Sequence, residues 1–153
     1  MIKKSVLLSI KPQYAEAILD GSKTDELRKR LWKMKPTSEE WKYFDVFSEI
    51  HHNITTVLLY ATAPVCKIVG QCTVKNILRG KCDDLWWITK PCNALSRYEF
   101  NADFEGCKTG YAVSIIDPVR YPEPIDLVGH PPQSWCYWPR AGSNKTEITK
   151  GTQ

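Results

Sequence analysis

The sequence predicts an α+β domain, a small mixed or antiparallel β-barrel with two to four helices packed around it. Several short runs are rich in β-branched and aliphatic residues, and a few segments have the apolar spacing of a helix. The helices do not alternate regularly with the strands. A parallel doubly wound sheet needs a crossover helix between most of its strands, so that architecture is disfavoured.

The opening segment predicts a strand, a helix and a second strand. Residues 5–10 (SVLLSI) form a short apolar run, and Pro12 suits the first turn of a helix. Gly21 is placed to end that helix. The segment 24–30 then alternates, so its even-numbered side chains share one face of a strand. The residues with i, i+3, i+4 helical spacing are Tyr14, Ala17 and Ile18.

The rest of the chain continues this mixture of strands and helices. Gly70 interrupts an alternating run and indicates a bulge or the close approach of another backbone. Asp83 and Asp84 begin a helical pattern, where acidic residues complement the positive end of the helix. The remaining predicted elements are strands at 55–63, 67–78, 110–119 and 125–128 and helices at 83–89 and 94–104.

The chain of 153 residues fits one domain. We expect this domain to span 1–139. Within it, 31–54 reads as an inserted, partly helical segment, in which Thr37 or Ser38 would cap a short helix. The segment 140–153 is polar and has no apolar period, which predicts a flexible tail.

Composition restricts the compartment and the partners. The formal net charge of +4 permits a polyanionic partner without requiring one. No pair of the six cysteines has C-x-x-C spacing. The first ten residues lack the apolar length of a secretory signal, and no run is long enough to cross a membrane. We therefore expect a cytoplasmic protein with reduced thiols.

Several motifs, in this order, resemble one family. They are LLSIKPQYAEAILDGSKTDELRKR, LLYATAPVCKIVGQ, GYAVSI, YPEPIDL and PPQSW. Together they resemble the ASCH domains of the PUA-like superfamily, most closely the prokaryotic subgroup of PUA-like predicted transcriptional regulators. The likeness runs from about Val6 to about Trp138. Its most specific part is G-x-K-x-x-E-x-R, formed by Gly21, Lys23, Glu26 and Arg28.

The resemblance implies a PUA-like pseudo-barrel with a cleft beside the first helix. Similar domains include RNA-binding modules, readers of modified bases, ribonucleases and amidohydrolases that remove an acyl group from cytidine. The implied partner is RNA, another single-stranded nucleic acid or a modified nucleoside. The amidohydrolase pattern has a threonine three residues after the lysine, and Glu26 stands there in this chain.

The candidate ligand-binding residues lie around that cleft. Lys11 and Lys23 flank the predicted helix and, with Arg28, suit phosphate groups. Glu26 can accept a hydrogen bond from the exocyclic amine of a base. We therefore expect nucleic-acid binding through a basic cleft. The other candidates are Tyr60 as a stacking platform, Gln133 as a contact to a base edge, and Thr62 and Ser134.

Simpler interpretations exist for three of these features. Glu26 and Arg28 could form an ion pair on a solvated strand, which would be worth up to about 1 kcal/mol. Tyr60 could be a core residue. Trp135, next to Ser134, could close the end of the barrel rather than contact a ligand.

The alternative function is an enzyme at the same cleft, either a metal-independent ribonuclease or an amidohydrolase acting on a modified nucleoside such as acylated cytidine. Lys23 would then be a nucleophile and Glu26 a general base. We expect no metal, since the histidines (His51, His52 and His130) lack the spacing of ligands, and no cofactor motif occurs. A third interpretation is a protein-interaction module whose partner surface is the aromatic segment 32–47.

Overall fold

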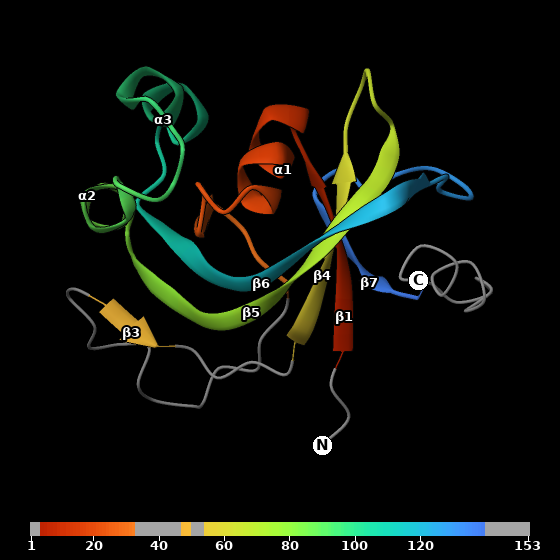
Figure 1. Cartoon of the computed structure of the whole chain (residues 1–153). Coiled ribbons are helices and arrows are strands. Elements are labelled where there is room, and N and C mark those ends of the chain that lie inside the picture. The colour runs from red at the N-terminus through yellow and green to blue at the C-terminus, as the bar shows by residue number, and fades with distance from the viewer. Residues whose placement is uncertain (1–3, 33–46, 50–53, 140–153) are drawn as a thin grey trace.

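The computed structural model describes residues 4–32, 47–49 and 54–139, which form three helices and a seven-stranded sheet (Figure 1). The predicted helix near Ser38, the histidines at 51 and 52 and the tail 140–153 lie outside the described residues. In chain order the elements are β1 (Lys4–Ile10), α1 (Pro12–Leu19), β2 (Asp25–Arg28), β3 (Phe47–Glu49), β4 (Ile54–Ala61), β5 (Lys67–Lys81), α2 (Cys82–Thr89), α3 (Arg97–Asp103), β6 (Thr109–Ile125) and β7 (Trp135–Trp138).

The sheet is mixed, which confirms the predicted α+β class. Its strand order is β2-β6-β5-β4-β1-β7, and β3 pairs with β5 outside this path. Strands β1 and β4 are parallel, and the other pairs are antiparallel. Among the described strands the sheet does not close, because β2 and β7 stand at the two ends of the order. This arrangement is consistent with a pseudo-barrel.

Strands β5 and β6 bend the sheet around the molecule. They are 15 and 17 residues long, and their pairing shifts register at three points between Ile68 and Asn76. Such irregularities bend a strand and increase its twist. Figure 1 shows both strands sweeping from one side of the molecule to the other, with α2 and α3 at one end and the β4–β5 turn at the other.

Helix α1 packs on the sheet because its apolar residues share one face. Tyr14, Ala15 and Ile18 are buried and join the largest core cluster. Pro12 stands in the first turn, and Gly21 has φ +87°, the left-handed conformation that suits a glycine after a helix. The predicted strand–helix–strand opening is therefore present.

The close approach predicted at Gly70 is also present. A Cβ atom there would lie 2.4 Å from the Val119 carbonyl oxygen and 2.6 Å from Cδ2 of Leu19 on α1. Gly70 thus lets α1 and β6 approach β5 at the same point.

The predicted strand at 125–128 is wrong, because β6 continues to Ile125 and the next residues leave the sheet. Residues 135–138, for which no strand was predicted, pair with β1 as strand β7. Helix α3 begins at Arg97 rather than at 94, because Ser96 and Glu99 form a capping box there.

Candidate functional site

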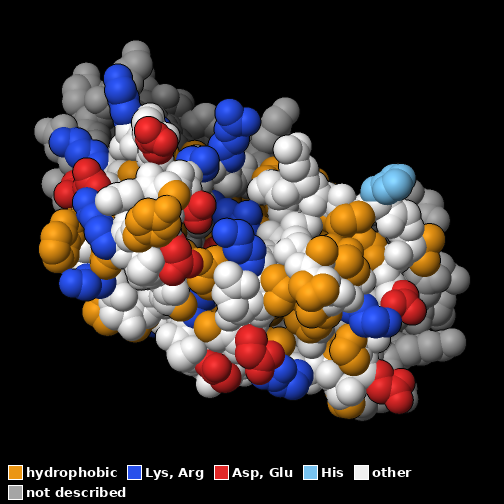
Figure 2. Space-filling view, turned by 90° about the horizontal axis from the view of Figure 1, so that it is seen from above, with side chains coloured by type: hydrophobic (Ala, Val, Ile, Leu, Met, Phe, Trp, Pro, Cys, Tyr) orange, Lys and Arg blue, Asp and Glu red, His pale blue; other side chains and the backbone are white. Residues whose placement is uncertain are grey.

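A cleft of about 720 Å³ opens beside the first turn of α1. Seen from above in Figure 2, Lys and Arg side chains gather around a hollow in the middle of this face. The lining includes most of the predicted site residues, which are Lys11, Glu26, Arg28, Thr62, Gln133 and Ser134. It also includes residues that the sequence did not single out, namely Ser9, Tyr14, Lys29, Arg30, Asp103 and Phe104.

Four parts of the chain carry most of these side chains, and Thr62, just after β4, comes from a fifth. The end of β1 and the start of α1 contribute Ser9 and Lys11, and β2 contributes Glu26 and Arg28. The loop before β7 contributes Gln133 and Ser134, and the end of α3 contributes Asp103 and Phe104. We call the first three parts the sheet wall and the α3 part the helical wall.

A buried ion-pair network supports the sheet wall. Oε2 of Glu26 lies 3.1 Å from Nζ of Lys23, and Oε1 lies 3.0 Å from Nε of Arg28, the second an ion pair without hydrogen-bond geometry. The Glu26 side chain is 10% exposed and that of Lys23 only 1%. The pair of Glu26 and Arg28 therefore exists, but on a buried strand rather than a solvated one.

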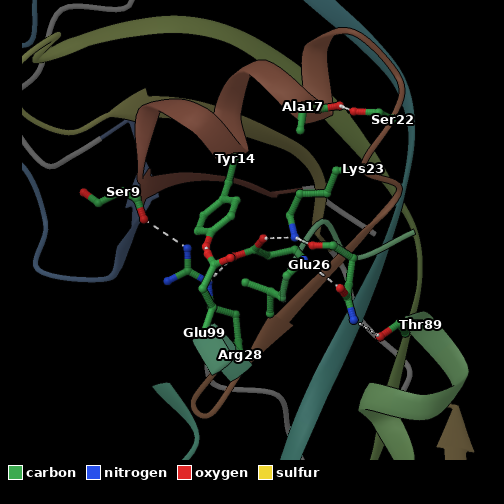
Figure 3. A network of polar contacts seen from close by, with 11 residues as sticks. Ser9, Tyr14, Ala17, Ser22, Lys23, Glu26, Arg28, Thr89 and Glu99 are labelled. Carbon is green, nitrogen blue, oxygen red and sulfur yellow. Dashed lines mark hydrogen bonds and ion pairs between the residues drawn. The ribbon is translucent and has the colours of Figure 1, made fainter. Parts of the chain in front are cut away.

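Lys23 lies behind Glu26 and does not line the cleft. Besides Glu26, its ammonium group contacts the Asn93 backbone oxygen and lies 5.4 Å from the centre of the Tyr14 ring (Figure 3). The backbone around it is held in the same way, since the Thr24 and Asp25 amides both donate to the Cys92 oxygen. Lys23 thus connects β2 to the segment between α2 and α3 and balances the charge of Glu26.

Arg28 joins the two ends of the open sheet. Its Nη2 donates to the Ser9 backbone oxygen at 3.0 Å, and its Nη1 donates to Oγ of Ser134 at 3.4 Å. The Ser9 amide in turn donates to the Ser134 oxygen, and Oγ of Ser9 donates to the Pro132 oxygen. The floor of the cleft is therefore a continuous polar network from β2 to the loop before β7.

The lining carries more positive than negative charge. Four basic side chains line it (Lys11, Arg28, Lys29 and Arg30), against two carboxylates (Glu26 and Asp103). Of the basic ones, Arg28 is partly buried and the other three are exposed to solvent. Such an arrangement favours an anionic ligand whose charge is spread over several groups.

Within the described residues, one side-chain hydrogen bond links the helical wall to α1. The Tyr14 hydroxyl donates to Oε2 of Glu99, while Oε1 of Glu99 accepts from the Ser96 amide in the capping box (Figure 3). Oγ of Ser96 accepts from the Glu99 amide at 3.1 Å. Glu99 therefore stabilises the start of α3 and also positions the helix beside the cleft.

The structure does not bring Tyr60 to the cleft. Tyr60 is 5% exposed and packs in a separate core cluster with Leu7, Leu58, Ile68 and Tyr121. Its ring has no open face for a base, which corrects the proposed stacking role. Trp135 is half-buried against Trp32, with ring centres 6.0 Å apart, so it packs within the fold.

Burial raises the pKa of two acidic side chains, Cys72 and Asp25. Burial, reinforced by the charge of Glu26, raises the pKa of the Cys72 thiol to about 12, so this thiol stays protonated in the core. Burial also raises the pKa of Asp25 above its usual value, although a hydrogen bond from Ser114 opposes the shift.

The described residues contain no cluster of His, Cys, Asp or Glu that could hold a metal ion. All six cysteines are free.

Thr24, the threonine next to Lys23, lies outside the cleft lining. Across the described part of the chain, no helix has the length and apolar character needed to span a membrane.

Comparisons with known sequences and structures found proteins that are similar to this chain. No protein-family model matches the chain. An "ASCH domain-containing ribonuclease" from Zymomonas mobilis is 28% identical over 127 residues, which cover 82% of this chain and 72% of the relative. The crystal structure of an ASCH protein from the same organism has a TM-score of 0.72 at 25% identity, covering 96% of this chain and 92% of that chain.

The chain has the fold of an ASCH domain. A variant of the Zymomonas mobilis ASCH protein gives the same result, with a TM-score of 0.73, 24% identity and coverage of 97% of this chain and 94% of that chain. In sequence and in fold, the chain is thus similar to ASCH domain proteins. The large ribosomal subunit protein uL22 of Ureaplasma parvum is 21% identical over 124 residues, which cover 81% of this chain but only 34% of that protein.

Proposed function

We propose that the cleft binds single-stranded RNA. The observation that carries this proposal is the set of four basic side chains around one hollow, next to a buried network with two cations and one carboxylate. Phosphate groups are the natural complement of such a site. The ribonuclease name of a relative that covers most of this chain favours RNA over other polyanions.

The chemistry of the lining suits a nucleotide. Arg28 offers a planar guanidinium, whereas Lys11 and Lys29 offer flexible point charges, so several phosphate positions can be held. The hydroxyl groups of Thr62 and Ser134 can bond a ribose 2′-hydroxyl, and the exposed Gln133 amide can contact a base edge. A cleft of about 720 Å³ has the size of a small-ligand pocket and suits an unpaired nucleotide better than a duplex.

The test is a titration of labelled single-stranded RNA, followed by fluorescence anisotropy at several salt concentrations. Lys11→Ala and Arg30→Ala are the informative variants, because both side chains are exposed and line the cleft. Each should weaken binding and lower the salt slope of log Kd by about 0.7 for each phosphate group that the variant no longer neutralises. Lys75→Ala and Lys108→Ala remove the same charge from exposed positions outside the lining and serve as controls. Equal effects in both pairs would contradict binding in the cleft.

RNA cleavage at the same cleft is the second candidate, favoured by the ribonuclease name of the Zymomonas mobilis relative. Glu26 would accept the proton of a 2′-hydroxyl as that oxygen attacks the neighbouring phosphorus, and Arg28 would stabilise the added negative charge. The bond to the 5′-oxygen would then break, leaving a 2′,3′-cyclic phosphate on one fragment, and the departing 5′-oxygen would take a proton from water to end as a 5′-hydroxyl. Lys23 would hold the Glu26 carboxylate in position, since it lies behind Glu26.

Cleavage is tested with the same RNA, with a chelator and with added Mg²⁺, by separating the products. The expected product carries a cyclic phosphate, and an RNA with a single 2′-deoxynucleotide at the scissile position should remain intact. Arg28→Lys keeps the charge but loses the forked geometry, so it should cleave more slowly. RNA binding without cleavage under all conditions would show that the protein binds RNA but does not cleave it.

A further inference from the structure

The end of α3 places an aromatic ring and a carboxylate at the cleft that the basic side chains also line. Phe104 and Asp103 both line the cleft, and neither belongs to the basic sheet wall. We infer that these two residues form a base-recognition subsite that selects bases with amino groups over uracil. This inference rests on the proposed binding of single-stranded RNA.

Phe104 has the position of a stacking platform. Its ring is stacked on Phe100, with centres 4.8 Å apart and planes at 15°, and Phe100 in turn meets Trp86 edge-on at 5.8 Å. Phe104 itself is only partly buried and lines the cleft. The ring is thus supported by a packed aromatic row while still bordering the cleft. Stacking on such a ring accepts every base, so Phe104 supplies affinity rather than selectivity.

Asp103 supplies the selectivity. Its carboxylate is exposed and has no hydrogen bond or ion pair within the described parts of the chain. Glu26, the other carboxylate of the lining, already has a cation at each oxygen. An unpaired carboxylate repels phosphate and accepts hydrogen bonds, so it favours the part of a nucleotide that offers N–H donors.

The donors on each base give an order of preference. Guanine presents two neighbouring N–H donors on its Watson–Crick edge, which match the two oxygens of a carboxylate. Adenine and cytosine each present one amino group. Uracil presents one N–H between two carbonyl oxygens. The carboxylate repels these two oxygens. The expected order is therefore guanine first, adenine and cytosine next, and uracil last.

The arrangement of the two walls fits a nucleotide that spans them. Arg28, Lys29 and Arg30 lie on or just after β2, whereas Asp103 and Phe104 end α3. Figure 2 shows acidic side chains beside the basic ones around the hollow. Phosphates would lie along the sheet wall while a base turns towards α3, which Tyr14 holds in place through Glu99.

The experiment compares four short oligouridine RNAs that differ only in one central nucleotide, which is G, A, C or U. Anisotropy titrations at one salt concentration give four Kd values for each protein variant. The wild type should bind the G oligonucleotide about tenfold more tightly than the U oligonucleotide, which corresponds to one good base contact. Asp103→Asn should reduce this ratio towards one and tighten binding of the U oligonucleotide, because an amide both donates and accepts.

Phe104→Leu should weaken all four RNAs by about tenfold without changing their order, whereas Phe104→Tyr should keep the affinity. The matched controls are Asp84→Asn and Trp87→Leu on α2, which make similar changes outside the cleft lining and should leave all four Kd values unchanged. Circular dichroism melting checks that each variant is folded.

The failure of this inference can be distinguished from the failure of the proposed function. Arg30→Ala should weaken all four RNAs equally. If it does so while the wild type and Asp103→Asn show no base preference, the subsite is wrong and the cleft still binds RNA. If the wild type binds none of the four RNAs, the proposed function and the inference both fail.

Discussion

The two walls of the cleft are built in different ways. The sheet wall holds its charges in a buried network, in which Glu26 lies between Lys23 and Arg28 and both cations also contact backbone oxygens. The helical wall is a seven-residue helix held by the Tyr14–Glu99 contact, a capping box and the packing of Phe100. Changes in the buried network of the sheet wall should therefore affect the whole fold, whereas changes in the helical wall should act locally.

The largest effect should come from removing the carboxylate of the sheet wall. Glu26→Ala leaves the buried Lys23 ammonium without its counter-charge, which should lower the free energy of unfolding by roughly 3–5 kcal/mol. Urea denaturation measures this loss. Glu16→Ala is the control, because it breaks the exposed pair with Arg120 and should change the stability little. Similar losses in both variants would show that the buried network has no special role.

A second loss of stability is expected at Gly70 on β5, where α1 and β6 approach closely. Gly70→Ala places a Cβ atom 2.4 Å from the Val119 oxygen and 2.6 Å from Leu19 of α1. The expected loss of stability is about 1–3 kcal/mol, because β6 or α1 must shift to make room. Thermal melting measures it, and an unchanged melting temperature would contradict the close approach of these elements.

The stability of the helical wall should depend on the hydroxyl group of Tyr14. Tyr14→Phe removes the donor to Glu99 and should cost about 1 kcal/mol. The more specific readout is hydrogen exchange: the amides of α3 should exchange faster, while those of β1 and β2 keep their rates. Faster exchange in both walls would mean that the two walls are not independent.

A smaller effect concerns Asp25, at the start of β2. Burial raises the pKa of Asp25 in the folded state, so its contribution to stability is fully present below the unfolded pKa and is lost as the pH rises through the folded pKa. Asp25→Asn should remove this loss. The stability of the variant minus that of the wild type should therefore be larger at neutral pH than in acid. Urea denaturation across the acid range checks the direction, and Ser114→Ala tests the opposing hydrogen bond.

The sequence predicted the sheet wall better than the helical wall, for physical reasons. Strand alternation placed Glu26 and Arg28 on one face, and local signals at Pro12 and Gly21 bounded α1. These features depend on neighbours in the chain. The burial of Lys23 could not be predicted, because its partner oxygen belongs to Asn93, seventy residues away.

The helical wall depends on contacts between distant segments, which a single sequence does not reveal. Asp103 and Phe104 lie at the cleft because α3 is held there, in part by the contact of Glu99 with Tyr14, 85 residues earlier in the chain. Tyr60 was misplaced for a related reason, since residues 57–61 of β4 are all buried and the sequence does not indicate which end or face of the strand borders the cleft. Strand β7 was missed because nearby prolines are typical of a turn.

RNA binding in the cleft can be tested by mapping where RNA contacts the protein. Single-stranded RNA carrying one photoreactive nucleotide is cross-linked to the wild-type protein, and the modified peptides are identified by mass spectrometry. Binding in the cleft predicts cross-links in peptides that contain Ser9 to Tyr14, Glu26 to Arg30, Asp103 and Phe104, or Gln133 and Ser134. Specific cross-links confined to other surfaces, such as the exposed Trp87 and Ile88 on α2, would contradict RNA binding in the cleft.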